Sequence, residues 1–270
     1  MKDLERYFKQ NNQRVIDKWL HYFDIYERHF NKFRDKEIVL LEAGVFHGGS
    51  LQMWKHYFGT KAKIYGIDIN PNCKEVEEEN IEILIGSQTD RNFLNELKDR
   101  IPAIDILIDD GGHTMNQQIT FFEEMYSHVK ADGVYLCEDT HTSYWKRYGG
   151  GYKRRNSFIE YSKDFIDGLH AYHSEQSSFQ ESKFTNTTDS VHYYDSVVVL
   201  EKKLRKKPYR ELTGTKKVPS PVLKEGTKLE RLQSKWVNYK LYYEGYLIKH
   251  TLLFILHRIF KFFNIKNFKW

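Results

Sequence analysis

Two short stretches of this 270-residue chain each end in a pair of carboxylates. Residues 104–108 and 133–137 are mainly apolar runs bounded by turn-forming residues, which is typical of buried strands. Parallel strands end at the same edge of a sheet, and open α/β sheets bind their ligands at that edge. The side chains that would meet there are Asp109, Asp110, His113, Glu138 and Asp139.

Four carboxylates so close together raise one another's pKa unless a cation lies among them. The pattern therefore predicts a hard metal ion, and all-oxygen ligands favour Mg²⁺ or Ca²⁺ over zinc. Residues 114–129 are predicted to form a helix, which places His113 at a helix N-terminus. The dipole disfavours the imidazolium there, so His113 is a candidate general base. A purely structural histidine at a helix cap is the alternative interpretation.

A glycine-rich turn follows the first predicted strand. Residues 38–43 form a short apolar run with an acid near its end, and residues 44–50 read G-V-F-H-G-G-S before a helical stretch. Strand, glycine turn and helix open a nucleotide-binding unit, but a carboxylate before the first glycine would repel a pyrophosphate. It suits a cationic ligand, such as the sulfonium and ammonium of S-adenosylmethionine. The predicted cofactor contacts of this unit are Glu42, Gly44, Gly48 and Ser50.

The second and third predicted strands add further cofactor contacts. Residues 63–68 end in Asp68, 20 residues beyond Gly48, where a carboxylate can accept hydrogen bonds from a ribose diol. A dinucleotide dehydrogenase would explain this acid but not the one before the glycine turn. The third strand leads to Ser87 and Gln88, which either pair with the adenine edge or belong to an ordinary polar loop.

Aromatic residues gather in two segments beside the predicted sheet edge. Through residues 3–34 they form an apolar stripe together with Leu4 and Val15, mostly at intervals of three or four positions, which predicts one or two amphipathic helices. These helices pack on the core or close over the cofactor as a lid. The loop 140–151 contains Tyr144 and Trp145, which are candidates for stacking on a sugar or base, although a surface connection fits equally. Residues 174–184 are predicted to include a strand, and residues 191–200 to form the final strand.

Charge divides the chain into an acidic body and a basic tail. Residues 202–270 hold 18 Lys and Arg against four Asp and Glu, although the whole chain carries a net charge of only +5. A basic segment favours phosphate, whether of nucleic acid, anionic lipid or a nucleotide. Three of the five prolines lie in residues 202–235, which predicts a linker or arm. Residues 236–265 have the pattern of a basic amphipathic helix, which fits a membrane surface, the domain itself or a second subunit.

Cysteine content and the first residues bear on the compartment. Cys73 and Cys137 are the chain's two cysteines, too few for a disulfide framework and not spaced as a zinc-ligand pair. Residues 1–10 are charged and lack the apolar core of a secretory signal. We therefore predict a reducing, cytoplasmic setting.

Four motifs taken together resemble a known family. L-L-E-A-G-V-F-H-G-G-S, Y-G-I-D-I-N-P, I-D-D-G-G-H-T and E-D-T-H-T-S-Y-W are similar to class I S-adenosylmethionine-dependent methyltransferases of the macrolide and rhamnosyl sugar O-methyltransferase type, a group that includes proteins labelled cephalosporin hydroxylase. The resemblance covers residues 36–200. It implies a Rossmann-like α/β fold with a seven-stranded, mostly parallel sheet and helices on both faces. The domains expected are an N-terminal helical lid (1–35), the methyltransferase domain (36–201), the basic arm (202–235) and the C-terminal amphipathic helix (236–270).

The resemblance also implies roles for individual residues. The family's magnesium ligands match Asp110, Glu138 and Asp139. The family's general base matches His113. Glu42 and Asp68 match the positions beside the methionine and ribose parts of the cofactor, and Asp109 lies nearest its amino-acid end. The sequence departs from the family in the glycine turn, where the role of His47 is unassigned.

The resulting functional prediction is Mg²⁺-dependent methylation of a sugar hydroxyl. The expected substrate is a nucleotide sugar, a surface-glycan precursor or a glycosylated natural product, with no nucleic-acid partner. A membrane contact through 236–270 at the inner face of the membrane, and a homo-oligomer, are compatible with the tail. Two rival hypotheses remain: an oxygenase that binds iron through His113 and two carboxylates, and a non-catalytic membrane-peripheral module with this fold.

Overall fold

The computed structural model describes residues 2–218. The chain separates into two compact units, Met1–Tyr209 and Arg210–Trp270. The first unit contains every helix and strand described below. Of the second unit, residues 210–218 are described and contain no helix or strand. The predicted helix over 236–270 and residues 219–235 of the predicted arm lie outside the described residues.

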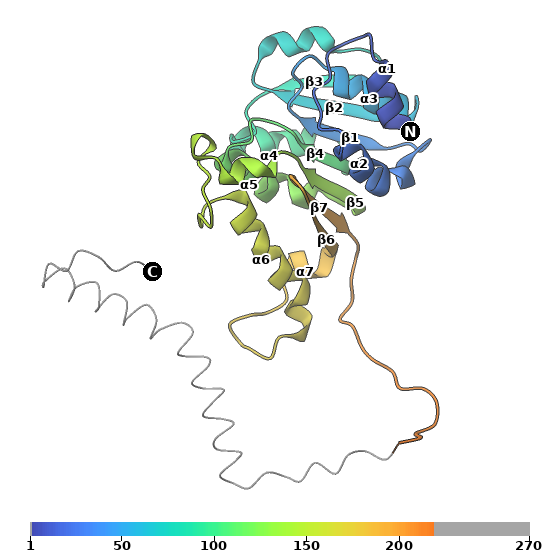
Figure 1. Cartoon of the computed structure of the whole chain (residues 1–270), viewed down its shortest axis with the longest axis vertical. Helices are drawn as coiled ribbons and strands as arrows, with labels where there is room; N and C mark the ends of the chain where they lie inside the picture. Colours follow the sequence, from blue (N-terminus) through green and yellow to red (C-terminus); the bar gives the residue numbers. More distant parts are fainter. Residues whose placement is uncertain (1, 219–270) are drawn as a thin grey trace, which may run out of the picture. The chain divides into compact units, whose positions relative to one another are not determined.

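A single seven-stranded sheet forms the centre of the first unit, in the order β3-β2-β1-β4-β5-β7-β6 (Figure 1). The first five strands are parallel, whereas β7 runs antiparallel to both β5 and β6. The strand order reverses between β1 and β4. The strands are β1 (Val39–Ala43), β2 (Lys63–Asp68), β3 (Ile81–Ile85), β4 (Ile104–Asp109), β5 (Val129–Cys137), β6 (Thr188–Tyr194) and β7 (Val197–Lys202).

Helices cover both faces of the sheet because successive strand residues point to opposite sides. Leu40 packs with the helices of one face and Leu41 with those of the other. The first face is covered by α1 (Asp3–Gln10), α2 (Tyr22–Phe30) and α3 (Gly49–Phe58). The second face is covered by α4 (Arg91–Arg100), α5 (Met115–Met125) and α6 (Phe158–His170), with the short α7 (Lys183–Thr187) beside α6. The predicted Rossmann-like, mostly parallel fold is confirmed.

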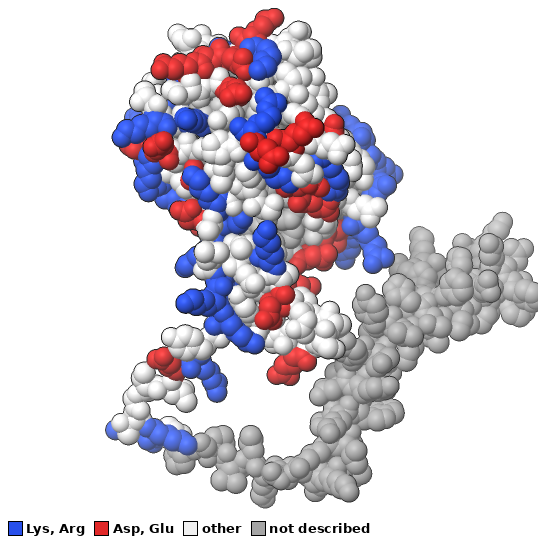
Figure 2. All heavy atoms as spheres, turned by 180° about the vertical axis from the view of Figure 1, so that it is seen from behind, with Lys and Arg blue, Asp and Glu red and all other residues white. Residues whose placement is uncertain are grey.

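Several short 3₁₀ segments complete the first unit, most of them in the connections between helices and strands. They are η1 (Asn31–Phe33), η2 (Pro71–Val76), η3 (Tyr126–His128), η4 (Thr140–Tyr144), η5 (Lys146–Tyr148) and η6 (Ala171–His173). Among residues 2–218, no helix has the length and apolar character needed to cross a bilayer. On the face shown in Figure 2, acidic and basic side chains of the described residues are interspersed, so this face carries no continuous field of one sign.

Three predicted elements differ from the structure. The helix predicted over 114–129 ends at Met125, because β5 begins at Val129 rather than at residue 133. The strand predicted within 174–184 is wrong: this stretch is a loop that leads into α7. The strand predicted over 191–200 is the hairpin of β6 and β7. Its turn is at Asp195 and Ser196, and Ser196 has a positive φ of 65°.

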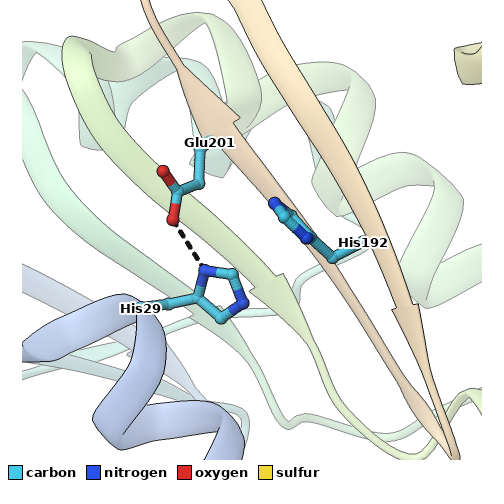
Figure 3. A group of neighbouring side chains, drawn as sticks. All are labelled: His29, His192 and Glu201. Atoms are coloured by element: carbon cyan, nitrogen blue, oxygen red, sulfur yellow. Dashed lines mark hydrogen bonds and ion pairs between the residues drawn. The ribbon is translucent and has the colours of Figure 1, made fainter.

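A buried histidine connects α2 to this hairpin (Figure 3). His29 Nδ1 lies 2.7 Å from Glu201 Oε1 on β7, and His29 Nε2 lies 2.9 Å from the Tyr194 hydroxyl on β6. The ring of His192 stands at a steep angle to that of His29, with their centroids 4.8 Å apart. Both nitrogens of His29 are therefore already used in contacts that fix the N-terminal helix to the sheet.

Glu201→Gln is expected to lower the free energy of unfolding by about 1 kcal/mol at neutral pH, because it weakens the contact with His29 at a partly exposed site. The hydrogen bond from His29 lowers the pKa of Glu201 to about 2. Its stabilising contribution is therefore complete above the usual glutamate pKa and is lost as the pH falls towards 2. Urea unfolding at neutral and acidic pH measures this, and Glu96→Gln on the exposed surface of α4 is the control. A difference from wild type that stays constant as the pH falls would contradict the pairing.

Candidate active site

A cavity of about 620 Å³ lies at the carboxyl ends of the parallel strands. It is lined by the loops after β1, β2, β3, β4 and β5 and by residues 15–19, which lie between α1 and α2. The strand order reverses between β1 and β4, and ligands of open α/β sheets bind at such a switch point. Of the predicted site residues, those that line the cavity are Gly44, Ser50, Asp68, Gln88, Asp110, His113, Glu138, Asp139 and Trp145.

The glycine turn is built around Gly44. Its φ is +95°, and a Cβ at this position would lie 2.0 Å from the backbone oxygen of Asp110, so the turn after β1 and the turn after β4 touch through their backbones. Asp68 orders the other side of the turn, because its Oδ2 accepts hydrogen bonds from the backbone N–H groups of Val45 at 2.9 Å and Phe46 at 3.2 Å. The carboxylate predicted to bind a ribose therefore also shapes the turn.

Gly44→Ala is expected to lower the free energy of unfolding by about 2 kcal/mol, because alanine is strained at this φ and its Cβ would meet a backbone oxygen. Displacement of the turn should also weaken binding of S-adenosylhomocysteine, which calorimetry would measure. Gly151→Ala is the matched control, since a Cβ there meets its nearest atom at 3.6 Å. Equal stability of the two variants would show that the two turns can separate without cost.

Glu42 is completely buried beneath the glycine turn. Its Oε2 accepts hydrogen bonds from the Ser50 hydroxyl at 2.8 Å and from the Trp54 indole N–H at 3.2 Å. Burial raises the pKa of Glu42 to about 7. Its Oε1 has no hydrogen-bond partner within the described part of the chain. Among the described residues, Ser50 lines the cavity whereas Glu42 does not.

Asp109 and Gln88 join the loops after β4 and β3. Asp109 is completely buried, and its oxygens accept hydrogen bonds from the Gln88 amide at 2.9 Å and the Tyr135 hydroxyl at 3.3 Å. Burial raises the pKa of Asp109 to about 6. The Gln88 amide oxygen accepts from the backbone N–H of Gly112 at 2.9 Å. The structure therefore engages Gln88 in holding the loop before α5, and Ser87 contacts Thr89 rather than lining the cavity.

The predicted acidic cluster converges with His113 on the cavity. His113 Nε2 lies 3.5 Å from Asp139 Oδ2 and 3.8 Å from Asp110 Oδ1. The ligand atoms of these three residues all lie within 4.8 Å of one another, so they could hold one metal ion. His113 and Asp139 both have positive φ, an uncommon backbone conformation that recurs at functional sites.

Two tyrosines of α2 donate hydrogen bonds to two further oxygens of the cluster. The Tyr22 hydroxyl donates to Asp139 Oδ1 at 2.6 Å, and the Tyr26 hydroxyl donates to Glu138 Oε1 at 2.7 Å. Glu138 is 1% exposed, and burial raises its pKa well above the usual value. An N-terminal helix therefore positions side chains that follow β5, which the spacing of aromatic residues alone could not indicate.

The structure contains a cation in this cluster that the sequence analysis did not identify. The Lys18 ammonium forms a short contact with Asp110 Oδ2, lies 2.9 Å from Glu138 Oε2 and lies 3.6 Å from Glu42 Oε1. Burial would lower the pKa of Lys18, but the surrounding carboxylates outweigh burial and raise it. The sequence contains one signal for this cation. Four predicted carboxylates required a positive charge, and a lysine of the chain itself can supply it.

Residues 11–21 are not helical, so the predicted N-terminal helices are shorter than their apolar stripe. Val15 and Trp19 belong to that stripe but are 54% and 55% exposed, and they line the cavity instead of packing in the core. Of the two predicted substrate residues, Trp145 lines the cavity with its ring against His141. Tyr144 is exposed and, among the described residues, is not part of the cavity wall.

Comparison with known proteins gives consistent matches. Residues 41–140 match the family model described as a methyltransferase domain. The chain is 33% identical over 198 residues to 8-demethyl-8-alpha-L-rhamnosyl tetracenomycin-C 2'-O-methyltransferase of Streptomyces olivaceus, which covers 69% of this chain and 52% of that protein. It is 35% identical over 202 residues to demethylmacrocin O-methyltransferase of Streptomyces fradiae, with 70% and 51% covered. The chain therefore spans about half the length of these curated relatives.

A solved structure shows the same likeness in three dimensions. The MycE methyltransferase from the mycinamycin biosynthetic pathway, in complex with Mg, SAH and mycinamycin VI, superposes with a TM-score of 0.66 at 30% identity, over 74% of this chain and 53% of that chain. A second MycE structure, with Mg and SAH, gives a TM-score of 0.67 at 26% identity and covers 86% of this chain. Residues 41–140 therefore belong to a methyltransferase domain, and the fold around them is the Rossmann-like fold of class I methyltransferases.

Proposed function

We propose that this protein transfers the methyl group of S-adenosylmethionine to a hydroxyl of a sugar, with the help of Mg²⁺. The observation that carries the proposal is the position of Asp110, His113 and Asp139, which meet in the cavity beside the glycine turn. The relatives support it, because their names describe O-methylation of a rhamnosyl tetracenomycin and of demethylmacrocin, and the MycE structure is a complex with Mg and SAH.

The residues present fit a divalent cation. Asp110, Glu138 and Asp139 supply oxygen donors, which Mg²⁺ prefers. The cluster already draws a positive charge into a buried position, that of Lys18. We propose these three carboxylates as the ligands. When bound, Mg²⁺ lowers the pKa of a sugar hydroxyl that contacts it.

The protein's own groups then have separate roles. Glu42, held by Ser50 and Trp54, places a carboxyl group beneath the glycine turn, and the ammonium and sulfonium of the cofactor would favour its charged form. Asp68 faces the cavity near the expected ribose. His113 Nε2 accepts the hydroxyl proton while the oxygen attacks the methyl carbon, so that the O–C bond forms as the S–C bond breaks. Trp145 offers an aromatic surface for the sugar.

We further propose that residues 1–35 act as a lid, because their segment 15–19 forms part of the cavity wall. The acceptor is proposed to be a glycosylated natural product or a nucleotide sugar. We also propose that the protein is cytoplasmic and that residues 236–270 contact a membrane surface. Flotation with anionic liposomes, with and without residues 236–270, tests it, and equal recovery of both forms would exclude a role for the tail in binding these membranes.

An acceptor screen tests the proposed activity. The protein is incubated with S-adenosylmethionine, Mg²⁺ and either glycosylated macrolides or nucleotide sugars, and mass spectrometry detects the added methyl group. Treatment with EDTA should abolish transfer, and Mg²⁺ should restore it. Binding of S-adenosylhomocysteine without transfer to any sugar would overturn the assignment of the acceptor. Full transfer in EDTA would overturn the metal assignment, and stoichiometric iron in the purified protein would favour the oxygenase hypothesis.

A further inference from the structure

Lys18 occupies the part of the cavity where positive charge is needed. Its side chain is 2% exposed, although the segment that carries it, residues 11–21, is largely exposed and lacks helix or strand structure. The ammonium has three donors and lies beside three carboxylates, those of Glu42, Asp110 and Glu138. A lysine so enclosed is rare unless its charge is compensated.

Two of these carboxylates, those of Asp110 and Glu138, are among the three ligands proposed for the metal ion. Asp110 Oδ2 and Glu138 Oε2 contact Lys18, and Glu138 Oε1 accepts a hydrogen bond from the hydroxyl of Tyr26. Both oxygens of Glu138 are therefore engaged while Lys18 is in place. A divalent ion bound by Asp110 and Glu138 would stand next to the ammonium, and the two cations would repel each other strongly at this burial.

Other contacts hold this segment on the body of the protein towards its two ends. Arg14 donates to the backbone oxygen of Val76 at 2.9 Å and pairs with Glu78 at 3.3 Å. Ile16 packs against the core from a partly buried position. Trp19 is 55% exposed, and its ring meets the edge of His141 at a centroid distance of 6.0 Å. Lys18 is thus the central polar attachment of the segment, between Arg14 towards one end and His21 at the other, whose ring Nε2 lies 3.1 Å from the backbone oxygen of Asp195.

We propose that Lys18 and the divalent ion compete for the carboxylates of Asp110 and Glu138, so that binding of the ion releases Lys18 and loosens the segment 11–21 over the cavity. The inference rests on the proposed function, because it takes its metal ligands from there. In the metal-free protein the lysine neutralises the cluster and holds the segment down. In the metal-bound protein the ion takes over the neutralising role, and the cavity is more accessible to the acceptor.

Calorimetric titration with Mg²⁺ alone tests the competition. Lys18→Met keeps an unbranched side chain and removes the charge, so the ion no longer displaces an ammonium, and we expect Mg²⁺ to bind about tenfold more tightly than to wild type. Lys130→Met is the matched control, because Lys130 pairs with Asp105 at 2.8 Å outside the cavity. It should leave the affinity for Mg²⁺ unchanged. Equal or weaker binding by Lys18→Met would overturn the competition, since the lysine would then be neutral for the ligands or would orient them.

Hydrogen exchange on the wild-type protein gives a second readout that does not depend on the folding of a variant. Mg²⁺ should increase amide exchange in residues 11–21, whereas slower or unchanged exchange would contradict the release of Lys18. The outcomes also separate the two proposals. Mg²⁺-dependent methyl transfer with equal Mg²⁺ affinity of both proteins overturns the competition alone. Tighter binding by Lys18→Met without methyl transfer to any sugar overturns the proposed activity alone, and absence of Mg²⁺ binding by either protein overturns both.

Discussion

Asp110→Asn is expected to reduce Mg²⁺-dependent methyl transfer by a factor of about 10³. The substitution removes a charged oxygen donor from the proposed metal site, and such a site supplies several kcal/mol of transition-state stabilisation. Asp110 is also the carboxylate that contacts Lys18 most closely and that faces His113 Nε2 at 3.8 Å. Initial rates at saturating cofactor, with the affinity for Mg²⁺ measured by calorimetry, check the prediction.

Asp17→Asn is the matched control for this substitution. Asp17 lines the same cavity from the N-terminal segment but is exposed. Its substitution therefore removes an equal charge without removing a proposed ligand. Its rate should stay close to that of wild type, and both variants should retain binding of S-adenosylhomocysteine. Full Mg²⁺-dependent turnover by Asp110→Asn would contradict the ligand assignment, and a loss of rate in Asp17→Asn of similar size would indicate a general effect of charge.

The parallel sheet and its acidic edge could be predicted from sequence because their signals are local. Buried parallel strands are short apolar runs. The residue after each run lies at the sheet edge, and this position does not depend on how the helices pack. Asp110 and Asp139 therefore reach the cavity as predicted. The same argument could not tell that Asp109 is buried behind Gln88, since only packing decides which side chain of a pair faces the ligand.

The N-terminal segment could not be predicted in the same way. The spacing of its apolar residues fits a helix through Val15 and Trp19, but α1 ends at Gln10. There Asn11 accepts a hydrogen bond from the backbone N–H of Gln13, a local turn that competes with the helix. The partners of Lys18 are 24 to 120 residues away in sequence, so no local pattern indicates its burial.

The hairpin of β6 and β7 was missed for a different reason. Its turn residues, Asp195 and Ser196, include no glycine, although Ser196 has a positive φ and two-residue hairpin turns usually signal themselves by Asn-Gly or Asp-Gly. The residues around the turn are compatible with a continuous strand. The tertiary contacts of α2 with β6 and β7, made through His29, are what the linear pattern lacks.

The position of His113 fits two roles, that of a general base and that of a metal ligand. Its Nε2 faces the carboxylates of Asp110 and Asp139, which fits a base that receives a proton beside the metal ion, but also a ligand to that ion. Its Nδ1 is buried and, within residues 2–218, has no hydrogen-bond partner. A base and a ligand differ in what their removal does to binding of the ion.

His113→Ala is expected to lower the rate of methyl transfer by a factor of about 10² to 10⁴, the usual contribution of a general base. Because the proposed ligands are carboxylates, the variant should still bind Mg²⁺ with nearly the affinity of wild type, which calorimetry measures. His47→Ala, an exposed histidine outside the cavity wall, is the control and should keep the wild-type rate. Loss of Mg²⁺ binding together with the rate would make His113 a ligand, whereas an unchanged rate would remove it from the mechanism altogether.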